Sequence, residues 1–132
     1  MTGVALVRSF PAHPSALFQI RRFVRECADG AGLREDVAHD IVLAVSEASA
    51  NSVVHTSSPN VKVSWTENED RVEVVIQDQG VFRRHVPMPE FEGRGHGMPL
   101  MMALVDEMTI KEGTPAKPGT LVRLVKLKNH PR

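Results

Sequence analysis

The chain has 132 residues and a mass of 14.6 kDa, enough for one domain with a substantial core. Its 16 basic residues balance its 16 acidic ones, which argues against a dedicated nucleic-acid binder. The N-terminus lacks a signal-peptide pattern, no apolar run approaches the roughly 20 residues of a membrane span, and the single Cys27 cannot form an internal disulfide. We therefore expect one cytoplasmic domain over residues 1–132, without direct contact to membrane or nucleic acid.

The first half of the chain predicts a strand, two helices and two further strands. Val4–Phe10 is a short apolar run bounded by turn-forming residues, as expected of a strand. Pro14 suits the first turn of a helix, and apolar residues then recur at helical spacing until Gly30. A longer helix and a pair of strands follow. The five elements are predicted over residues 4–10, 14–30, 34–56, 61–66 and 71–78.

The second half predicts a loop, a third helix and two more strands. Residues 81–92 contain two prolines and no period, which is typical of a loop. After Gly97, apolar residues recur at helical spacing as far as Met108. Strands are predicted near 107–111 and 119–126, joined by a turn-rich segment. Strand pairs with helices grouped between them predict an α+β fold, a two-layer sandwich.

Three polar residues of the second helix, Glu47, Asn51 and His55, share one face because they are spaced four residues apart. This face borders the apolar stripe, where it can line a cleft floored by the sheet. A carboxylate one turn from an amide suits phosphoryl transfer, since the amide oxygen can hold Mg²⁺ and the carboxylate can deprotonate an attacking hydroxyl. An ordinary exposed helix face explains the same spacing.

The strand before the loop ends in a carboxylate. Val72, Val74 and Ile76 alternate along it, and Asp78 continues the alternation, so its side chain projects to the same face. If that face is the core, the buried charge needs a partner, and an adenine amino group would supply one. Gly80 lets the backbone pass close to a flat ligand. A simple turn at the strand end is the alternative.

Glycine alternates with basic residues immediately before the third helix, as Gly93, Arg94, Gly95, His96 and Gly97. Glycines permit close backbone approach, and the unpaired amides at a helix start attract anions, so the segment predicts a phosphate-binding loop. It is neither a P-loop, since no Gly-Lys-Ser/Thr follows, nor a dinucleotide fingerprint, since a loop precedes it. A flexible hinge is the alternative.

Taken together and in this order, the three motifs resemble the GHKL ATPase superfamily, which includes gyrase, histidine-kinase and chaperone ATP domains. In its length and in the sequences of its motifs, the chain resembles the bacterial anti-sigma-factor serine kinases. Residues 43–55 look like that family's N-box helix, residues 93–107 like its glycine box and the helix that follows, and Gly119-Thr120 like its terminal threonine contact. The resemblance covers residues 4–127 and implies the Bergerat fold, a mixed but mainly antiparallel sheet with helices on one face.

The resemblance also implies a role for each matching residue. Glu47 is implied as the catalytic base that activates a serine or threonine hydroxyl of a protein substrate, and Asn51 as the Mg²⁺ ligand. Asp78 is implied to recognise adenine, with Gly80 beside it and Thr120 in support. The five residues from Gly93 to Gly97 are implied to wrap the phosphates of ATP, and residues 81–92 to form the ATP lid.

The activity that the resemblance implies is an ATP-dependent serine/threonine kinase that acts as an anti-sigma factor. It would sequester a sigma factor, phosphorylate a small antagonist protein and form a homodimer, so that partner switching regulates transcription. The family usually has Asp-x-Gly-x-Gly, whereas Phe82 stands here at the second glycine. Phe82 therefore motivates a second hypothesis, a switch module that binds a partner without catalysis. A third is an ATPase domain that serves a separate phosphatase or receptor chain.

Overall fold

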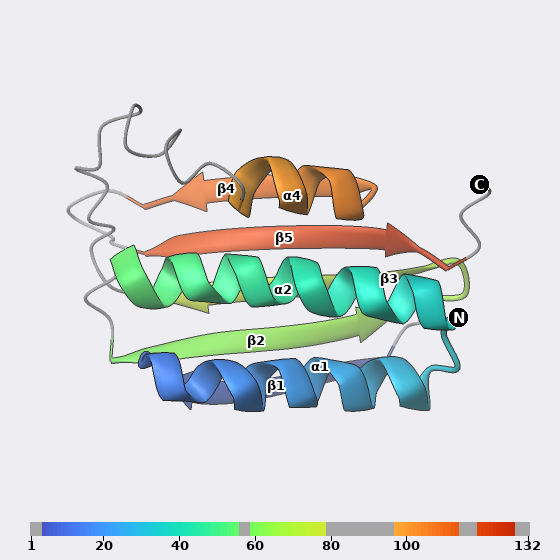
Figure 1. Ribbon diagram of the computed structural model, residues 1–132, viewed down its shortest axis with the longest axis horizontal. Coiled ribbons are helices and arrows are strands. Elements are labelled where there is room, and N and C mark those ends of the chain that lie inside the picture. Colours follow the sequence, from blue (N-terminus) through green and yellow to red (C-terminus); the bar gives the residue numbers. More distant parts are fainter. Residues whose placement is uncertain (1–3, 56–58, 79–96, 114–118, 129–132) are drawn as a thin grey trace.

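The computed structural model describes residues 4–55, 59–78, 97–113 and 119–128, which form an α+β fold of two layers. A five-stranded sheet forms one layer, and the described helices all lie on one of its faces (Figure 1). The prediction of a two-layer sandwich is confirmed. The elements are β1 (Val4–Pro11), η1 (Pro14–Ala16), α1 (Leu17–Gly30), α2 (Glu35–His55), β2 (Asn60–Glu67), β3 (Arg71–Asp78), α4 (Gly97–Leu104), β4 (Glu107–Glu112) and β5 (Thr120–Leu127).

The strand order across the sheet is β1-β2-β3-β5-β4, and the four neighbouring pairs are all antiparallel. β2 and β3 form a hairpin, in which Asn68 donates its backbone N–H to the carbonyl of Arg71. β4 is likewise followed in the chain by its partner β5. The pairing of β3 with β5 joins these two units at the centre of the sheet.

The core lies between the sheet and the helices because the inward face of each central strand is apolar. Val72, Val74 and Ile76 of β3 are buried, as their alternation predicts, while the residues between them are half-buried. Trp65 of β2, which is 1% exposed, is the largest fully buried side chain and lies opposite Val74 in the sheet. Burial of apolar surface on this face is what holds the two layers together.

The two long helices contribute one apolar stripe each to this core. α1 begins after a 3₁₀ turn at Pro14–Ala16, where the imidazole of His13 accepts the backbone N–H of Ser15. It ends where Gly32 adopts a φ of +71°, a left-handed conformation that favours glycine. The buried residues of the two helices are Ile20, Phe23, Val24 and Ala28 in α1 and Val37, Ala38, Ile41, Ala44, Val45 and Ala48 in α2.

The helix predicted after Gly97 is shorter than its periodicity suggested. α4 ends at Leu104, and Met108 lies in β4 opposite Leu124, so its placement in the helix was wrong. Asp106 causes the change of direction, because its backbone N–H donates to the carbonyl of Val125 at 2.8 Å. Its carboxylate also accepts the N–H of Leu127 at 2.7 Å. These contacts align the chain with β5 and start a strand.

Candidate functional site

The end of β3 and the start of β5 place two polar side chains next to each other beneath the helices. Asp78 and Thr120 are directly opposite in the antiparallel pair, so both side chains project to the same face of the sheet. Asp78 is 3% exposed and Thr120 is 8% exposed. The prediction that Asp78 projects into the core is therefore confirmed. A carboxylate at this depth requires hydrogen-bond donors around it.

One of these donors comes from α2. The hydroxyl of Ser52 donates to Oδ2 of Asp78 at 2.8 Å, and Ser52 is itself buried. Ser52 was not predicted from the sequence, although it follows Asn51 directly and continues the apolar stripe of α2 one turn after Ala48. A polar residue within an apolar stripe was the available signal. The bond ties the last turn of α2 to the end of β3.

The hydroxyl of Thr120 has no hydrogen-bond partner among the residues that the structure describes. A buried, unsatisfied hydroxyl costs free energy, and a bound water, ion or ligand is one explanation for such a group in a native protein. Here the hydroxyl lies beside a carboxylate on the same sheet face. Together the two groups offer an acceptor and a rotatable donor, which fits the exocyclic amino group and ring nitrogens of adenine.

The three predicted polar residues Glu47, Asn51 and His55 lie on α2, beside its apolar stripe. Glu47 and Asn51 are both half-buried and one helical turn apart, so their side chains border the core without being enclosed by it. His55 is the last residue of α2. The C-terminal end of α2, the end of β3 and the start of β5 lie at the left end of the molecule in Figure 1. Asn51 directly precedes Ser52, which bonds Asp78, so Asn51 lies near the end of β3, and Glu47 lies one helical turn earlier in α2.

The glycine-rich segment is described only at its last residue. Gly97 is the first residue of α4, and in Figure 1 the N-terminus of α4 points toward the left end of the molecule, although the helix starts further inward than the left ends of α2 and β5. The helix therefore directs its unpaired backbone N–H groups, and the positive end of its dipole, toward this end. The remaining predicted residues of this part of the site lie outside the described residues: Gly80, the lid 81–92 with Phe82, Gly93, Arg94, Gly95 and His96.

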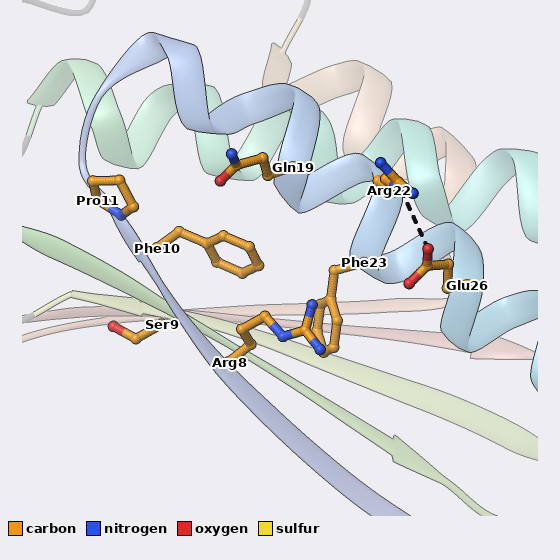
Figure 2. Close-up of a pocket in the computed structure, with 8 residues that line it drawn as sticks. All are labelled: Arg8, Ser9, Phe10, Pro11, Gln19, Arg22, Phe23 and Glu26. Atoms are coloured by element: carbon orange, nitrogen blue, oxygen red, sulfur yellow. Dashed lines mark hydrogen bonds and ion pairs between the residues drawn. The ribbon is translucent and has the colours of Figure 1, made fainter.

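A pocket of about 400 Å³ lies elsewhere, between β1 and α1. Figure 2 shows the aromatic rings of Phe10 and Phe23 along its inner side, with ring centroids 5.9 Å apart and the guanidinium of Arg8 over the Phe23 ring at 4.8 Å. None of the predicted site residues lines this pocket. Its lining consists of Arg8, Ser9, Phe10, Pro11, Gln19, Arg22, Phe23 and Glu26.

The described part of the chain was also searched for metal-ligand groups and for membrane-spanning helices. Its histidine, cysteine, aspartate and glutamate residues form no group of three that could hold a metal ion. Among its helices, none is both long enough and apolar enough to span a membrane.

The fold and the site together define a class of protein. A five-stranded antiparallel sheet with helices on one face, and a buried carboxylate at the end of the central strand, is the fold of a GHKL-type ATPase domain. The chain belongs to the histidine kinase-like ATPase domain family, which it matches over residues 10–126. An ATPase domain of this kind implies that the chain binds ATP.

Relatives within this family are similar over most of the chain. Serine-protein kinase RsbW of Bacillus velezensis is 27% identical over 139 aligned residues, which cover 92% of this chain and 84% of the relative. RsbW of Bacillus subtilis strain 168 shows the same identity and coverage. RsbW of Halalkalibacterium halodurans is 29% identical over 117 residues, covering 77% of this chain and 72% of that protein.

A solved structure supports the fold. The crystal structure of the RsbU and RsbW domains of Rv1364c from Mycobacterium tuberculosis superimposes with a TM-score of 0.75 at 23% identity. The match covers 98% of this chain but only 34% of the solved chain, so our protein spans about a third of that molecule. The expected likeness to the anti-sigma-factor serine kinases is thus confirmed as a distant homology over most of the chain.

Proposed function

We propose that this protein is an ATP-dependent serine/threonine kinase that acts as an anti-sigma factor, with residues 1–132 forming one domain. The observation that carries the proposal is the buried pair of Asp78 and Thr120, fastened to α2 through Ser52, in a chain of the histidine kinase-like ATPase family. The relatives named serine-protein kinase RsbW support the choice of reaction.

In this proposal Asp78 recognises adenine, and Thr120 supports it. The carboxylate accepts a hydrogen bond from the exocyclic amine, and the hydroxyl of Thr120, which has no partner in the described residues, bonds the ring or a bridging water. Gly80 passes beside the base. The Ser52 bond fixes the carboxylate, so that little ordering is needed when the nucleotide binds.

The phosphates lie, in the same proposal, between the start of α4 and the Glu47–Asn51 row. The oxygen of Asn51 would hold Mg²⁺, and the bound ion would neutralise phosphate charge. The segment from Gly93 to Gly97, including Arg94 and His96, wraps the phosphates, and residues 81–92 close over them. Glu47 takes the proton of the attacking serine hydroxyl; the new bond forms between that oxygen and the γ-phosphorus while the bond to ADP breaks.

The proposed partners are a sigma factor, which the protein sequesters, and a small antagonist protein, which it phosphorylates. The protein acts as a homodimer in a bacterial cytoplasm and regulates transcription by partner switching, without contacting nucleic acid or membrane itself. The homology to RsbW over 92% of this chain is what supports these partners.

Calorimetric titration with ATP, in the presence and absence of Mg²⁺, tests the nucleotide site. We expect saturable binding that Asp78→Ala abolishes and that Asn51→Ala makes independent of Mg²⁺. Asp70→Ala is the matched control, since Asp70 is an exposed carboxylate in the turn before β3. Equal affinity in wild type and Asp78→Ala would refute the proposed adenine contact.

Phosphate transfer from labelled ATP to a cognate antagonist tests the kinase step. Glu47→Gln should lower the rate by about 10²- to 10⁴-fold, the usual contribution of a general base, without changing ATP affinity. Glu69→Gln, an exposed glutamate in the turn between β2 and β3, is the control. Transfer at the wild-type rate in Glu47→Gln would rule out this base.

The position of Phe82 supports a second function, a switch module that binds its partner with little or no nucleotide. In that case the ring fills the space that the second glycine of the family leaves for adenine. Phe82→Gly should then raise ATP affinity, while partner binding survives both Glu47→Ala and Asn51→Ala. ATP binding that is as tight in wild type as in Phe82→Gly would exclude this function.

A further inference from the structure

A buried lysine connects three elements of the fold. Lys126 of β5 is 5% exposed and lies opposite the core residue Val72, so its side chain projects beneath the helices. Its ammonium group donates to the carbonyl oxygen of Leu104 at 2.7 Å and pairs with Oδ2 of Asp40 at 3.2 Å. Burying an ammonium is costly without such partners, so this position is not an ordinary strand residue.

The first partner is the end of α4. Leu104 is the last residue of that helix, where carbonyl groups lack partners within the helix and the dipole is negative. A buried ammonium there satisfies the carbonyl and complements the dipole. Lys126 therefore fixes the C-terminal end of α4 to the sheet.

The second partner, Asp40, lies on the same side of α2 as Glu47 and Asn51. Asp40 precedes Glu47 by seven residues and Asn51 by eleven, and these spacings place all three on one side of an α-helix. The side of α2 that carries Glu47 and Asn51 is thus the side that is bound, through Asp40 and Lys126, to the end of α4.

We propose that Lys126 is a positioning residue for phosphate binding. Through Leu104 and Asp40 it sets α4 relative to α2, and thereby sets Gly97 relative to Glu47 and Asn51. α4 has eight residues and a length of about 12 Å, so it moves as a short rigid rod and a shift at its end is transmitted to its start. This inference rests on the proposed function, because it assigns the start of α4 to the phosphates.

The experiment compares ATP with adenosine, which lacks phosphates. Lys126→Met keeps an unbranched side chain about as long as the aliphatic part of lysine and removes the ammonium group. We expect ATP with Mg²⁺ to bind at least about tenfold more weakly, as for a misplaced binding group, while adenosine, titrated by NMR, changes by less than about twofold. Lys128→Met is the matched control, since the ammonium of Lys128 pairs with Glu67 at 3.0 Å and not with Asp40 or the end of α4. This variant should change neither affinity.

A double variant separates positioning from stability. Lys126→Met leaves Asp40 without its ammonium, which destabilises the fold; Lys126→Met combined with Asp40→Leu removes that carboxylate and should regain stability in a thermal unfolding assay. ATP affinity should remain low in this double variant, because the carbonyl of Leu104 still has no ammonium to hold it.

Four results would overturn the inference, and they differ in what they say about the proposed function. Wild-type ATP affinity in a folded Lys126→Met protein refutes the positioning role alone. So does an equal loss of ATP and adenosine affinity, or full recovery of ATP affinity in the double variant, since both describe a purely structural residue. A wild-type protein that binds neither compound refutes the proposed function and the inference with it.

Discussion

The hydrogen bond from Ser52 to Asp78 should account for a measurable part of the stability of the fold. Replacing Ser52 by alanine removes the hydroxyl and leaves a buried carboxylate short of one donor at 2.8 Å. A hydrogen bond to a charged group contributes about 1.5–3 kcal/mol. The higher helix propensity of alanine offsets about 0.5 kcal/mol of this loss. The net expectation is a loss of roughly 1–2.5 kcal/mol in the free energy of unfolding.

This loss translates into a shift in melting temperature. The entropy of unfolding is about 2.1 cal/mol/K per residue, which for 132 residues is roughly 0.28 kcal/mol/K. Ser52→Ala should therefore lower the Tm by about 4–9 °C in a calorimetric or circular-dichroism melt without nucleotide.

Ser49 provides a matched control for this measurement. It is a fully buried serine on the same helix, but its hydroxyl has no partner among the described residues. Ser49→Ala gains the same helix propensity and should leave the Tm unchanged or raise it. If the two variants melt at the same temperature, or if Ser52→Ala costs as much in an Asp78→Ala background as in wild type, the Ser52–Asp78 bond does not stabilise the fold as argued.

Three further outcomes are expected. Thr120→Val removes a buried hydroxyl without a partner, so the ligand-free protein should gain about 1 kcal/mol in a denaturant titration while ATP affinity falls. A hydrogen bond from Arg25 holds the pKa of the Glu35 carboxyl below its ordinary value of 4.5. The Arg25–Glu35 pair therefore stabilises the fold fully above pH 4.5, and this stabilisation is lost as the pH falls through the lowered pKa. Glu35→Gln should therefore melt below wild type at pH 7, and the gap should close in acid. Burial raises the pKa of the Cys27 thiol to about 11. Because less of the thiol is then ionised, its alkylation by iodoacetamide at pH 8 should be about tenfold slower than that of an exposed cysteine. An equal rate would contradict the partial burial of Cys27.

The elements with a clear period could be predicted from the sequence almost to the residue. The strand over residues 71–78 was predicted with the bounds that β3 has, because alternation fixes both the strand and the face toward which Asp78 projects. The same reasoning failed at Met108, where a helical spacing of apolar residues continues into β4. The contacts of Asp106 with Val125 and Leu127 turn the chain out of the helical course, and both partners belong to β5, a later strand.

The motifs of the candidate site could be recognised in the sequence, but the contacts that surround them in the fold could not. Glu47, Asn51 and Asp78 stand in local patterns that carry their own chemical meaning. Ser52 and Lys126 gain their importance from partners 26 and 86 residues away, Asp78 and Asp40, which no local spacing reveals. Contacts of this kind arise only when the layers pack.

The order of the strands has a consequence for how the proposed site comes into being. Hairpins β2–β3 and β4–β5 join segments that are close in the chain, so each needs only a short closure. The β3–β5 pairing closes a loop of roughly 40 residues, residues 79–119, and is entropically costlier, which favours its late formation. Asp78 and Thr120 become neighbours only at that step. A growing chain on the ribosome would therefore have no adenine contact until β5 has emerged, and a nucleotide that binds there would stabilise only a chain whose topology is complete.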